Sequence, residues 1–334
     1  MYSWINSNHT LCSFHWHFIT LPWQLIGLVG TALAFIVGFK NNASYDRIWE
    51  ARKIWGGIVN TSRSLTIMVN DFITKPDNET NKRGEELFAI RKQIIMRHVA
   101  WMTTLRHALR IKKPWETFAF NKSDKEYISR IKIREYTYSL EEELQGYLSE
   151  EELKEVLSKN NKATAVLTIQ SRHFKALFLE GKIDNFRHVE IENQLVELFA
   201  LQGQSERIKN FPYPRQFATL NTYFVWVFIF LLPLGAIAQF DEIGKSLAES
   251  SLPFIQFIGN YFIWLAVPVT TLISWIFLLM ERIGDVTENP FEGGGNDIPI
   301  TSMSRGIEID IREMIGDDPN EIPKQHPITF DTQM

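Results

Sequence analysis

Two long apolar runs without a charged residue stand out in the second half of the chain. They occupy residues 217–240 and 252–280, and each is long enough to cross a hydrocarbon layer of about 30 Å as a helix. A third apolar run at residues 21–39 is just long enough to span, and its Pro22 suits the first turn of a helix. The pattern therefore predicts a membrane protein with three spanning helices.

The distribution of charge predicts which side of the membrane each part faces. The connection at residues 241–251 contains three acidic residues and one lysine, whereas most lysines and arginines lie between residues 40 and 215. Cytoplasmic segments of membrane proteins are enriched in Lys and Arg. We therefore expect a multi-pass protein of the inner or plasma membrane, with an external connection and with the polar middle and the C-terminus in the cytoplasm.

The polar middle of the chain has the periodicity of helices and shows no strand alternation of any length. Residues 41–63 predict that the first membrane helix continues into the cytosol. Ser149, followed three residues later by Glu152, has the pattern of a capping box, which marks a helix N-terminus. Further helices are expected at residues 85–109, 139–159, 162–181, 188–209 and 307–314.

These patterns predict an all-α protein in which membrane helices are continuous with a helical cytosolic domain. With 22% charged residues the average composition resembles that of a soluble protein, because the polar block dilutes the apolar runs. The expected parts are an N-terminal segment with the first membrane helix, a cytosolic helical domain, a membrane hairpin, and a cytosolic loop with the C-terminal tail. Their predicted bounds are 1–40, 41–216, 217–282 and 283–334.

Composition and motifs argue against several classes of function. A net charge of -4 gives no indication of nucleic-acid binding, and the single cysteine, Cys12, excludes an internal disulfide and any multi-cysteine metal site. No phosphate-binding glycine loop and no HExxH motif occurs. The three apolar runs contain no Asp, Glu, Lys, Arg or His, and such residues within membrane spans are usually functional. We therefore expect neither an enzyme nor a cofactor.

The first membrane span has an aromatic face. Thr31, Phe35 and Phe39 are spaced by four residues and share one side of a helix. In an oligomer that places this face on its axis, rings of phenylalanine would exclude water and act as a gate. The alternative is that these side chains face lipid or the protein core, and spacing alone favours this alternative because aromatic stripes are common in membrane helices.

Small residues form a second face of the same helix, about 100° further round its axis. Small residues allow membrane helices to approach closely, so this ridge is suited to helix–helix packing. The ridge consists of Gly30, Ala34 and Gly38.

Three blocks of sequence resemble the bestrophin family, and in particular its bacterial members. Residues 38–57, which read GFKNNASYDRIWEARKIWGG, resemble the segment that follows the family's pore helix. Residues 202–214 resemble the segment that enters the third family span, and residues 283–299 resemble the loop that follows the last span. The blocks occur in the family's order, and the resemblance extends from about residue 21 to residue 314.

The resemblance implies a bestrophin-like homopentamer that surrounds one axial pore, with a hydrophobic neck in the membrane and a wide cytosolic vestibule. The family's neck positions correspond to Thr31, Phe35 and Phe39, and Thr31 is more polar than the usual residue at that position. A second constriction is implied at the start of the helix after Gly181. The candidates for it are Ile183, Phe186 and Arg187.

The chain departs from the family in two places. Animal members bind calcium through acidic residues after the Asn-Pro-Phe loop, and here three glycines occupy most of that stretch, so that only Glu292 and Asp297 remain. Because calcium requires several oxygen ligands, we expect no metal site and little calcium control. In addition, residues 2–20 form a poor version of the family's first membrane helix.

The resemblance implies passive conduction of monovalent ions, with identical copies and the lipid bilayer as partners. Animal bestrophins conduct chloride, and we expect anion conduction here. Two alternatives remain open. One is a cation-selective channel of the same architecture, because apolar rings do not select the sign of an ion. The other, from a different class, is a non-conducting membrane scaffold or receptor.

Overall fold

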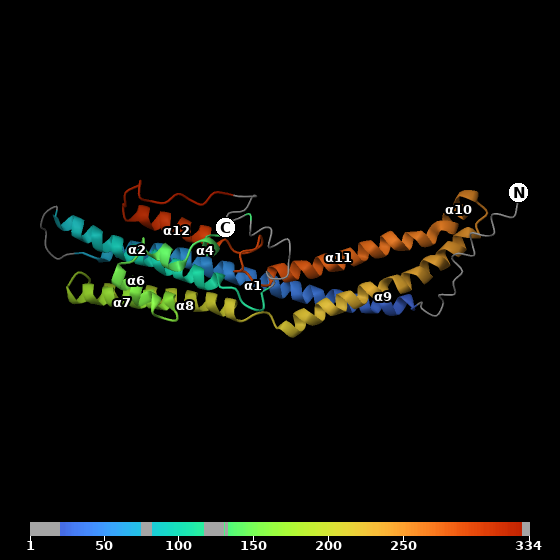
Figure 1. The fold of residues 1–334 in the computed structure, drawn as a ribbon, viewed down its shortest axis with the longest axis horizontal. Helices are drawn as coiled ribbons and strands as arrows, with labels where there is room; N and C mark the ends of the chain where they lie inside the picture. Colours follow the sequence, from blue (N-terminus) through green and yellow to red (C-terminus); the bar gives the residue numbers. More distant parts are fainter. Residues whose placement is uncertain (1–20, 75–81, 117–129, 131–132, 329–334) are drawn as a thin grey trace. The chain divides into compact units, whose positions relative to one another are not determined.

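The computed structural model describes the whole chain except residues 1–20, 75–81, 117–129, 131–132 and 329–334. Within the described residues every regular element is a helix and no strand occurs, so the all-α prediction is confirmed. Cys12 and the predicted N-terminal helix before residue 21 lie outside this part of the chain. The helices are α1 (Trp23–Phe72), α2 (Lys82–Arg110), α4 (Arg134–Thr137), α5 (Leu140–Leu144), α6 (Glu150–Leu157), α7 (Lys162–Leu179), α8 (Asn185–Asn210), α9 (Arg215–Ala248), α10 (Pro253–Tyr261), the 3₁₀ turn η3 (Phe262–Leu265), α11 (Ala266–Thr287) and α12 (Ile300–Met314) (Figure 1).

The described chain divides into two compact units. The membrane unit contains residues 21–44 and Tyr213–Asp285, and the helical unit contains Tyr45–Pro212 and residues 286–328. Helix α1 contributes to both, because it is one continuous helix of 50 residues. The predicted continuation of the first membrane helix beyond residue 40 is therefore confirmed.

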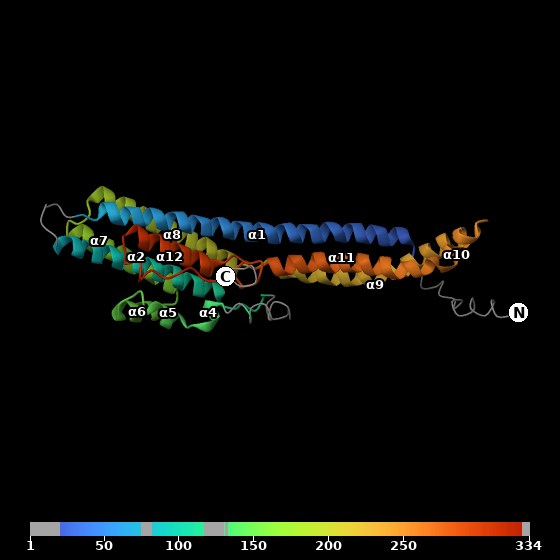
Figure 2. The ribbon, with the colours of Figure 1, turned by 90° about the horizontal axis from the view of Figure 1, so that it is seen from above.

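Among the residues that the structure describes, three helical segments are long and apolar enough to cross a membrane: α1, α9 and the segment Pro253–Thr287. In the membrane unit α1 buries Leu33 and Val37 against Val225 and Phe228 of α9. The ring of Phe228 also meets Phe277 of α11, with 4.7 Å between the ring centroids. Figure 2 shows α9 and α11 lying side by side in this unit. Buried apolar residues three and four positions apart thus define the inner face of α1.

The membrane hairpin differs from the prediction in its connection and within its second span. Helix α9 continues to Ala248, so most of the predicted connection at residues 241–251 is helical. The predicted second span is interrupted by the 3₁₀ turn η3 before α11 begins. Pro268 lies three residues into α11 and has no N–H to donate, and its ring clashes with the carbonyl of the residue four positions earlier. An α-helix therefore cannot continue undisturbed through this point.

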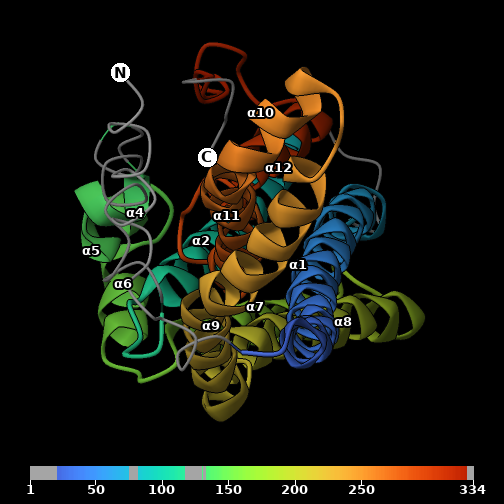
Figure 3. The same cartoon turned by 90° about the vertical axis from the view of Figure 1, so that its right-hand side faces the viewer.

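The helical unit is built around one apolar core. The part of α1 that belongs to the helical unit contributes Trp55, Ile58 and Leu65 at helical spacing, and α2 contributes Trp101. Phe174 of α7 is also fully buried in this core. Figures 2 and 3 show α4, α5 and α6 gathered beside α2. The unit thus buries large aromatic side chains at the meeting point of several helices, where their apolar area stabilises the fold most.

Residues 139–159 form two helices rather than the single helix expected. The predicted capping box at Ser149 is confirmed, because its hydroxyl accepts from the Glu152 N–H and the Glu152 carboxylate accepts from the Ser149 N–H. A second capping box, between Ser139 and Glu142, starts α5. Two start signals ten residues apart leave room for only a short first helix. Similarly, α12 starts at Ile300, earlier than the predicted residue 307.

His98 lies in the core of the helical unit, where burial lowers its pKa to about 4. Its Nε2 lies 2.8 Å from the Ser62 hydroxyl, and its ring stacks on Trp101. The imidazole therefore stays neutral in the folded protein at neutral pH. The His98 side chain is thus satisfied within the fold.

We predict that acid destabilises the protein through His98. Its folded-state pKa is below the unfolded value of 6.5, so the stabilisation is complete above pH 6.5 and is lost as the pH falls toward 4. The shift corresponds to at most about 3 kcal/mol in the free energy of unfolding. Thermal unfolding of wild type and His98→Gln between pH 7.5 and pH 4.5 measures this, because all other titrating groups are common to both chains. Equal losses of stability in the two chains would contradict the prediction.

Candidate functional site

The three residues expected at the neck lie together on an exposed face of α1. In the single chain Phe35 is 65% exposed and Phe39 is 70% exposed, whereas Leu33 and Val37 of the same helix are buried. The Thr31 hydroxyl donates a hydrogen bond to the carbonyl of Gly27 at 2.9 Å, so its polar group is satisfied within the helix. This face, formed by Thr31, Phe35 and Phe39 and called the aromatic stripe below, is therefore not part of the core of this chain. It is available to line a pore, to meet another subunit or to face lipid.

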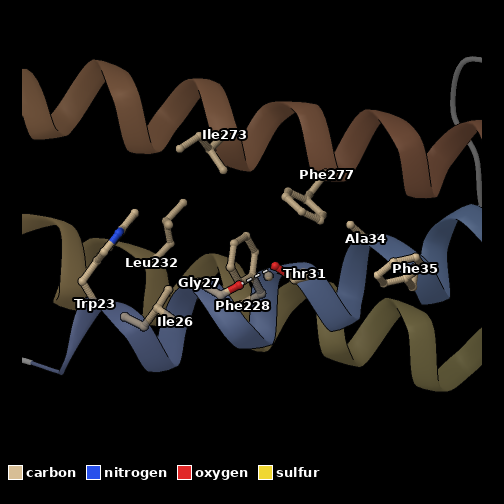
Figure 4. A pocket seen from close by; sticks show the side chains of 11 residues that line it. Trp23, Ile26, Gly27, Thr31, Ala34, Phe35, Phe228, Leu232, Ile273 and Phe277 are labelled. Atoms are coloured by element: carbon tan, nitrogen blue, oxygen red, sulfur yellow. Dashed lines mark hydrogen bonds between the residues drawn. The ribbon is translucent and has the colours of Figure 1, made fainter.

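An open groove of about 580 Å³ runs beside the aromatic stripe in the membrane unit (Figure 4). Thr31 and Phe35 contribute one wall, and Phe228 of α9 and Phe277 of α11 contribute the other side. The lining is almost wholly apolar, as expected for membrane helices. The groove offers no cluster of polar groups that would bind a polar ligand or carry out catalysis.

The small residues of the predicted ridge differ in their surroundings. A Cβ atom on Gly30 would lie 2.8 Å from the Phe228 ring, so this glycine is needed for packing within the chain. Nothing lies within 4 Å of such an atom on Gly38, and Ala34 is exposed. Only Ala34 and Gly38 therefore remain available for packing against a second copy, and the ridge is shorter than the sequence suggested.

A buried ionic cluster lies directly after the aromatic stripe. Lys40 follows Phe39 and has no solvent exposure, and its ammonium group donates to Glu281 at 2.8 Å and to Asp285 at 2.5 Å. The Thr222 hydroxyl donates to the same Glu281 carboxylate at 2.8 Å. Removing one partner of such a buried pair typically costs about 3–5 kcal/mol. The cluster therefore fixes the end of the stripe against α9 and α11.

Arg47 has a comparable role in the helical unit. Its guanidinium donates to the carbonyls of Ile208, Phe211 and Glu288 at 2.9, 2.8 and 2.9 Å. Two of these carbonyls belong to the C-terminal end of α8, where four carbonyls lack a partner within the helix. One side chain from the block at residues 38–57 thus joins α1, the end of α8 and the start of the loop after α11.

The residues proposed for the second constriction have different environments. Ile183 is buried in the core of the helical unit, which corrects its place among the candidates for a pore-facing residue. Phe186 is 83% exposed. Arg187 forms an ion pair with Asp184 at 3.0 Å, and its guanidinium lies 5.6 Å from the centroid of the Phe72 ring. Phe186 is therefore the candidate whose side chain is free to point into a pore.

The two carboxylates of the weak calcium candidate are already engaged by the chain. Glu292 accepts from the Asn289 amide at 2.6 Å, and Asp297 accepts from the backbone N–H groups of Gly293 at 2.5 Å and Gly294 at 3.0 Å. Asp297 is buried, and burial raises the pKa of its carboxyl group to about 6. Across the part of the chain that the structure describes, no three His, Cys, Asp or Glu residues are placed to hold a metal ion.

The loop also depends on glycine at one position. Gly293 has a φ of +94°, and an added Cβ would lie 2.3 Å from Ile133. An acidic residue at this position would be strained whatever its charge. The geometry of the loop thus explains why a carboxylate is not accommodated there.

We predict that calcium neither binds nor stabilises this loop. Because Glu292 and Asp297 already accept hydrogen bonds from the chain, calcium would have to displace those donors and would find too few further ligands. The unfolding temperature of the purified protein should be the same with calcium and with a chelator. Gly294→Asp serves as a comparison, because it adds a third carboxylate to the loop. A Cβ atom at this position would lie 3.5 Å from Oδ1 of Asp297, which is an ordinary van der Waals contact. Saturable stabilisation of the wild type by micromolar calcium, absent with magnesium, would contradict the prediction.

Comparison with known proteins gives consistent matches over most of the chain. A family model described as "Bacterial/Fungal Bestrophin protein" matches residues 4–245 and 249–313. Among curated relatives, the voltage-dependent anion channel-forming protein YneE of Escherichia coli K12 is 28% identical over 296 residues, which cover 89% of this chain and 77% of the relative. The protein of the same name from Salmonella typhi is 25% identical over 315 residues, covering 91% and 83%.

A solved structure agrees at the level of the fold. The crystal structure of a bacterial bestrophin homolog from Klebsiella pneumoniae is 23% identical, covers 92% of this chain and 93% of its own, and superposes with a TM-score of 0.70. The predicted resemblance to bestrophins is confirmed by these matches, and none of them describes an enzyme. The chain belongs to the bacterial and fungal bestrophin family.

Proposed function

We propose that the protein is a homopentameric channel of the cell membrane that conducts anions, chloride among them, through a pore on its fivefold axis. Relatives across several bacteria carry the name voltage-dependent anion channel-forming protein, and the chain shares their family. The helical unit then lies in the cytoplasm with the C-terminus, as the positive-inside rule favours.

One observation carries the proposal. The aromatic stripe is exposed in the single chain, while the adjacent faces of α1 pack against α9 and α11. A membrane helix that packs against its own chain on one face and is exposed on another face can pack against further copies in an assembly. With the stripe of each copy on the axis, Phe35 and Phe39 form two aromatic rings one helical turn apart, and Thr31 forms a more polar ring one turn further.

Such rings gate a pore by excluding water. An ion that passes a narrow ring of phenylalanines loses hydration without receiving compensating ligands, so the barrier is high until the ring widens. The buried Lys40 cluster holds α1 in place next to Phe39, which fixes the position of the Phe39 ring. In the helical unit Phe186 of each copy forms a second apolar constriction at the cytoplasmic end of the pathway.

The choice of ion does not follow from these rings. Aromatic rings do not select the sign of an ion, and the charge of Arg187 is balanced by Asp184. The anion preference in this proposal is therefore supported by the names of the relatives. A cation-selective channel of the same architecture and a non-conducting scaffold are the competing functions, and conductance measurements separate them.

The first prediction concerns assembly. Because three membrane segments and one exposed stripe do not enclose a pore in a single chain, the detergent-solubilised protein should be a pentamer. Native mass spectrometry should give five times the chain mass of 38.9 kDa. A monomeric or dimeric mass in several mild detergents would contradict the proposal of a pentameric channel.

The second prediction concerns the neck. Phe35→Ala and Phe39→Ala remove rings that the proposal places in the pore, so each variant should give several-fold larger or more persistent currents in reconstituted membranes, with little change in ion selectivity. Phe230→Ala is the matched control. Phe230 lies on α9, is 74% exposed and should face lipid, so its replacement should leave the currents unchanged. Wild-type currents from correctly assembled Phe35 and Phe39 variants would show that the stripe faces lipid or core.

The third prediction separates two neighbouring residues of the helical unit. Phe186→Ala should alter conductance or ion preference with little loss of stability, because Phe186 is exposed. Ile183→Ala should instead lower the free energy of unfolding by about 2–5 kcal/mol, because Ile183 lies in the core. Conductance and chemical denaturation of both variants test this contrast. The same phenotype in both would contradict the assignment of Phe186 to the pathway.

A further inference from the structure

A second cavity, of about 700 Å³, lies within the helical unit, and none of its lining residues belongs to the aromatic stripe. It is formed by the C-terminal end of α2, by α4, by the start of α7 and by the end of α8. The volume falls in the range typical of small-molecule sites. We call it the α2–α7 pocket. Its basic lining residues are His107, Arg110, Lys113, Lys162 and Lys209.

Arg110 is the most unusual residue of the α2–α7 pocket. It is only 2% exposed, and none of its three guanidinium nitrogens donates a hydrogen bond within the part of the chain that the structure describes. Among the described residues its ion-pair contact is with Asp297, and the 3.7 Å between the two groups is beyond hydrogen-bond distance. The closest oxygen of Asp297 already accepts from Gly293 and Gly294. A buried charge without hydrogen bonds is costly, so this guanidinium lacks a ligand.

The other acidic groups near the pocket accept hydrogen bonds elsewhere and form none with Arg110 among the described residues, although Glu135 lies close enough to attract its charge. Lys209 forms an ion pair with Glu116. Glu135 is bonded to Arg106 and to the Thr301 hydroxyl. These internal pairs leave the positive charge of Arg110 available to a bound group.

Two further cations stand at the pocket with no carboxylate in ion-pair contact among the described residues. The ammonium group of Lys113 lies 5.8 Å from the centroid of the Trp115 ring, and that of Lys162 lies 3.5 Å from the Lys159 carbonyl. Glu206 also lines the pocket, and its carboxylate accepts from Asn161 and Gln202. The pocket thus keeps an excess of positive charge.

The start of α7 adds a further feature favourable to anions. This helix of 18 residues begins at Lys162, and the side chain of its N-cap residue Asn161 accepts from the Thr164 N–H. The remaining N–H groups of the first turn have no partner within the helix, and the helix dipole places partial positive charge at this end. The first-turn N–H groups of α7, two lysines without a carboxylate partner among the described residues, and the buried guanidinium of Arg110 thus line one cavity.

We propose that the α2–α7 pocket binds the oxyanion of a small organic molecule, a carboxylate or a phosphate. Arg110 is the deep donor, and Lys113 and Lys162 hold the charge at the mouth. Leu109, Ile111 and Leu140 line the pocket as well and suit the carbon body of such a molecule. The site is separate from the proposed pore, and it is independent of whether the protein conducts ions.

The test measures anion-dependent stabilisation of the full-length protein in detergent. Inorganic phosphate and succinate are titrated against sodium chloride at equal ionic strength, and the unfolding temperature is recorded. Phosphate or succinate should stabilise the protein in a saturable manner, and the stronger of the two identifies the class of oxyanion. A response no greater than that to sodium chloride would overturn the proposal.

Three variants identify the site. Arg110→Met removes the buried charge while Asp297 keeps its two backbone donors, so this variant should fold and lose the saturable stabilisation. Lys162→Gln should weaken the apparent affinity by about tenfold, as expected for one charge-assisted hydrogen bond. Lys175→Gln is the control, because Lys175 is exposed on the same helix and does not line the pocket.

The variants remain informative even if one of them folds poorly. Lys162 is partly exposed at the first position of α7, so its replacement tests the pocket without touching the core. If Lys162→Gln responds like Lys175→Gln, or if Arg110→Met keeps the full stabilisation, the anion binds elsewhere and the proposal is wrong. Loss of stabilisation in Arg110→Met and Lys162→Gln alone supports it, whatever the conductance of the protein.

Discussion

The packing of one face of α1 is the constraint on which the rest of the structure depends. The same helix buries Leu33 and Val37 in the membrane unit and Trp55 and Ile58 in the helical unit. Because one continuous helix carries both sets, its rotation about its own axis is fixed in each unit by apolar burial. The direction of every other side chain of α1 follows from this, including the exposed stripe that begins at Thr31.

Ionic contacts supply what apolar packing cannot, namely a fixed position along the helix axis. The hydrophobic effect has no preferred direction, whereas the Lys40 ammonium group must remain within hydrogen-bond distance of Glu281 and Asp285. Arg47 acts similarly on the last carbonyls of α8. Both residues lie in the block of sequence that carried the family resemblance. Their contacts explain what this block does in the structure. Lys40 attaches the part of α1 next to the proposed neck to α11, and Arg47 attaches the following part of α1 to the end of α8.

Local patterns allowed much of the fold to be predicted from the sequence. Charge-free runs predicted the spans, a spacing of four placed Thr31, Phe35 and Phe39 on one face, and the Ser149 capping box marked the start of α6. The pairing of Lys40 with Glu281 joins residues 241 positions apart. No local pattern encodes it, although each residue directly follows an apolar run. The burial of Ile183 and the orphaned guanidinium of Arg110 likewise depend on neighbours that only the tertiary structure brings together.

The central claim is that an assembly of this chain conducts anions passively. The most direct test is the reversal potential of purified protein in planar bilayers that separate unequal concentrations of potassium chloride. The account predicts currents that reverse close to the equilibrium potential of chloride. A reversal close to the potassium potential would contradict anion selection, and a complete absence of current from assembled protein would contradict conduction itself.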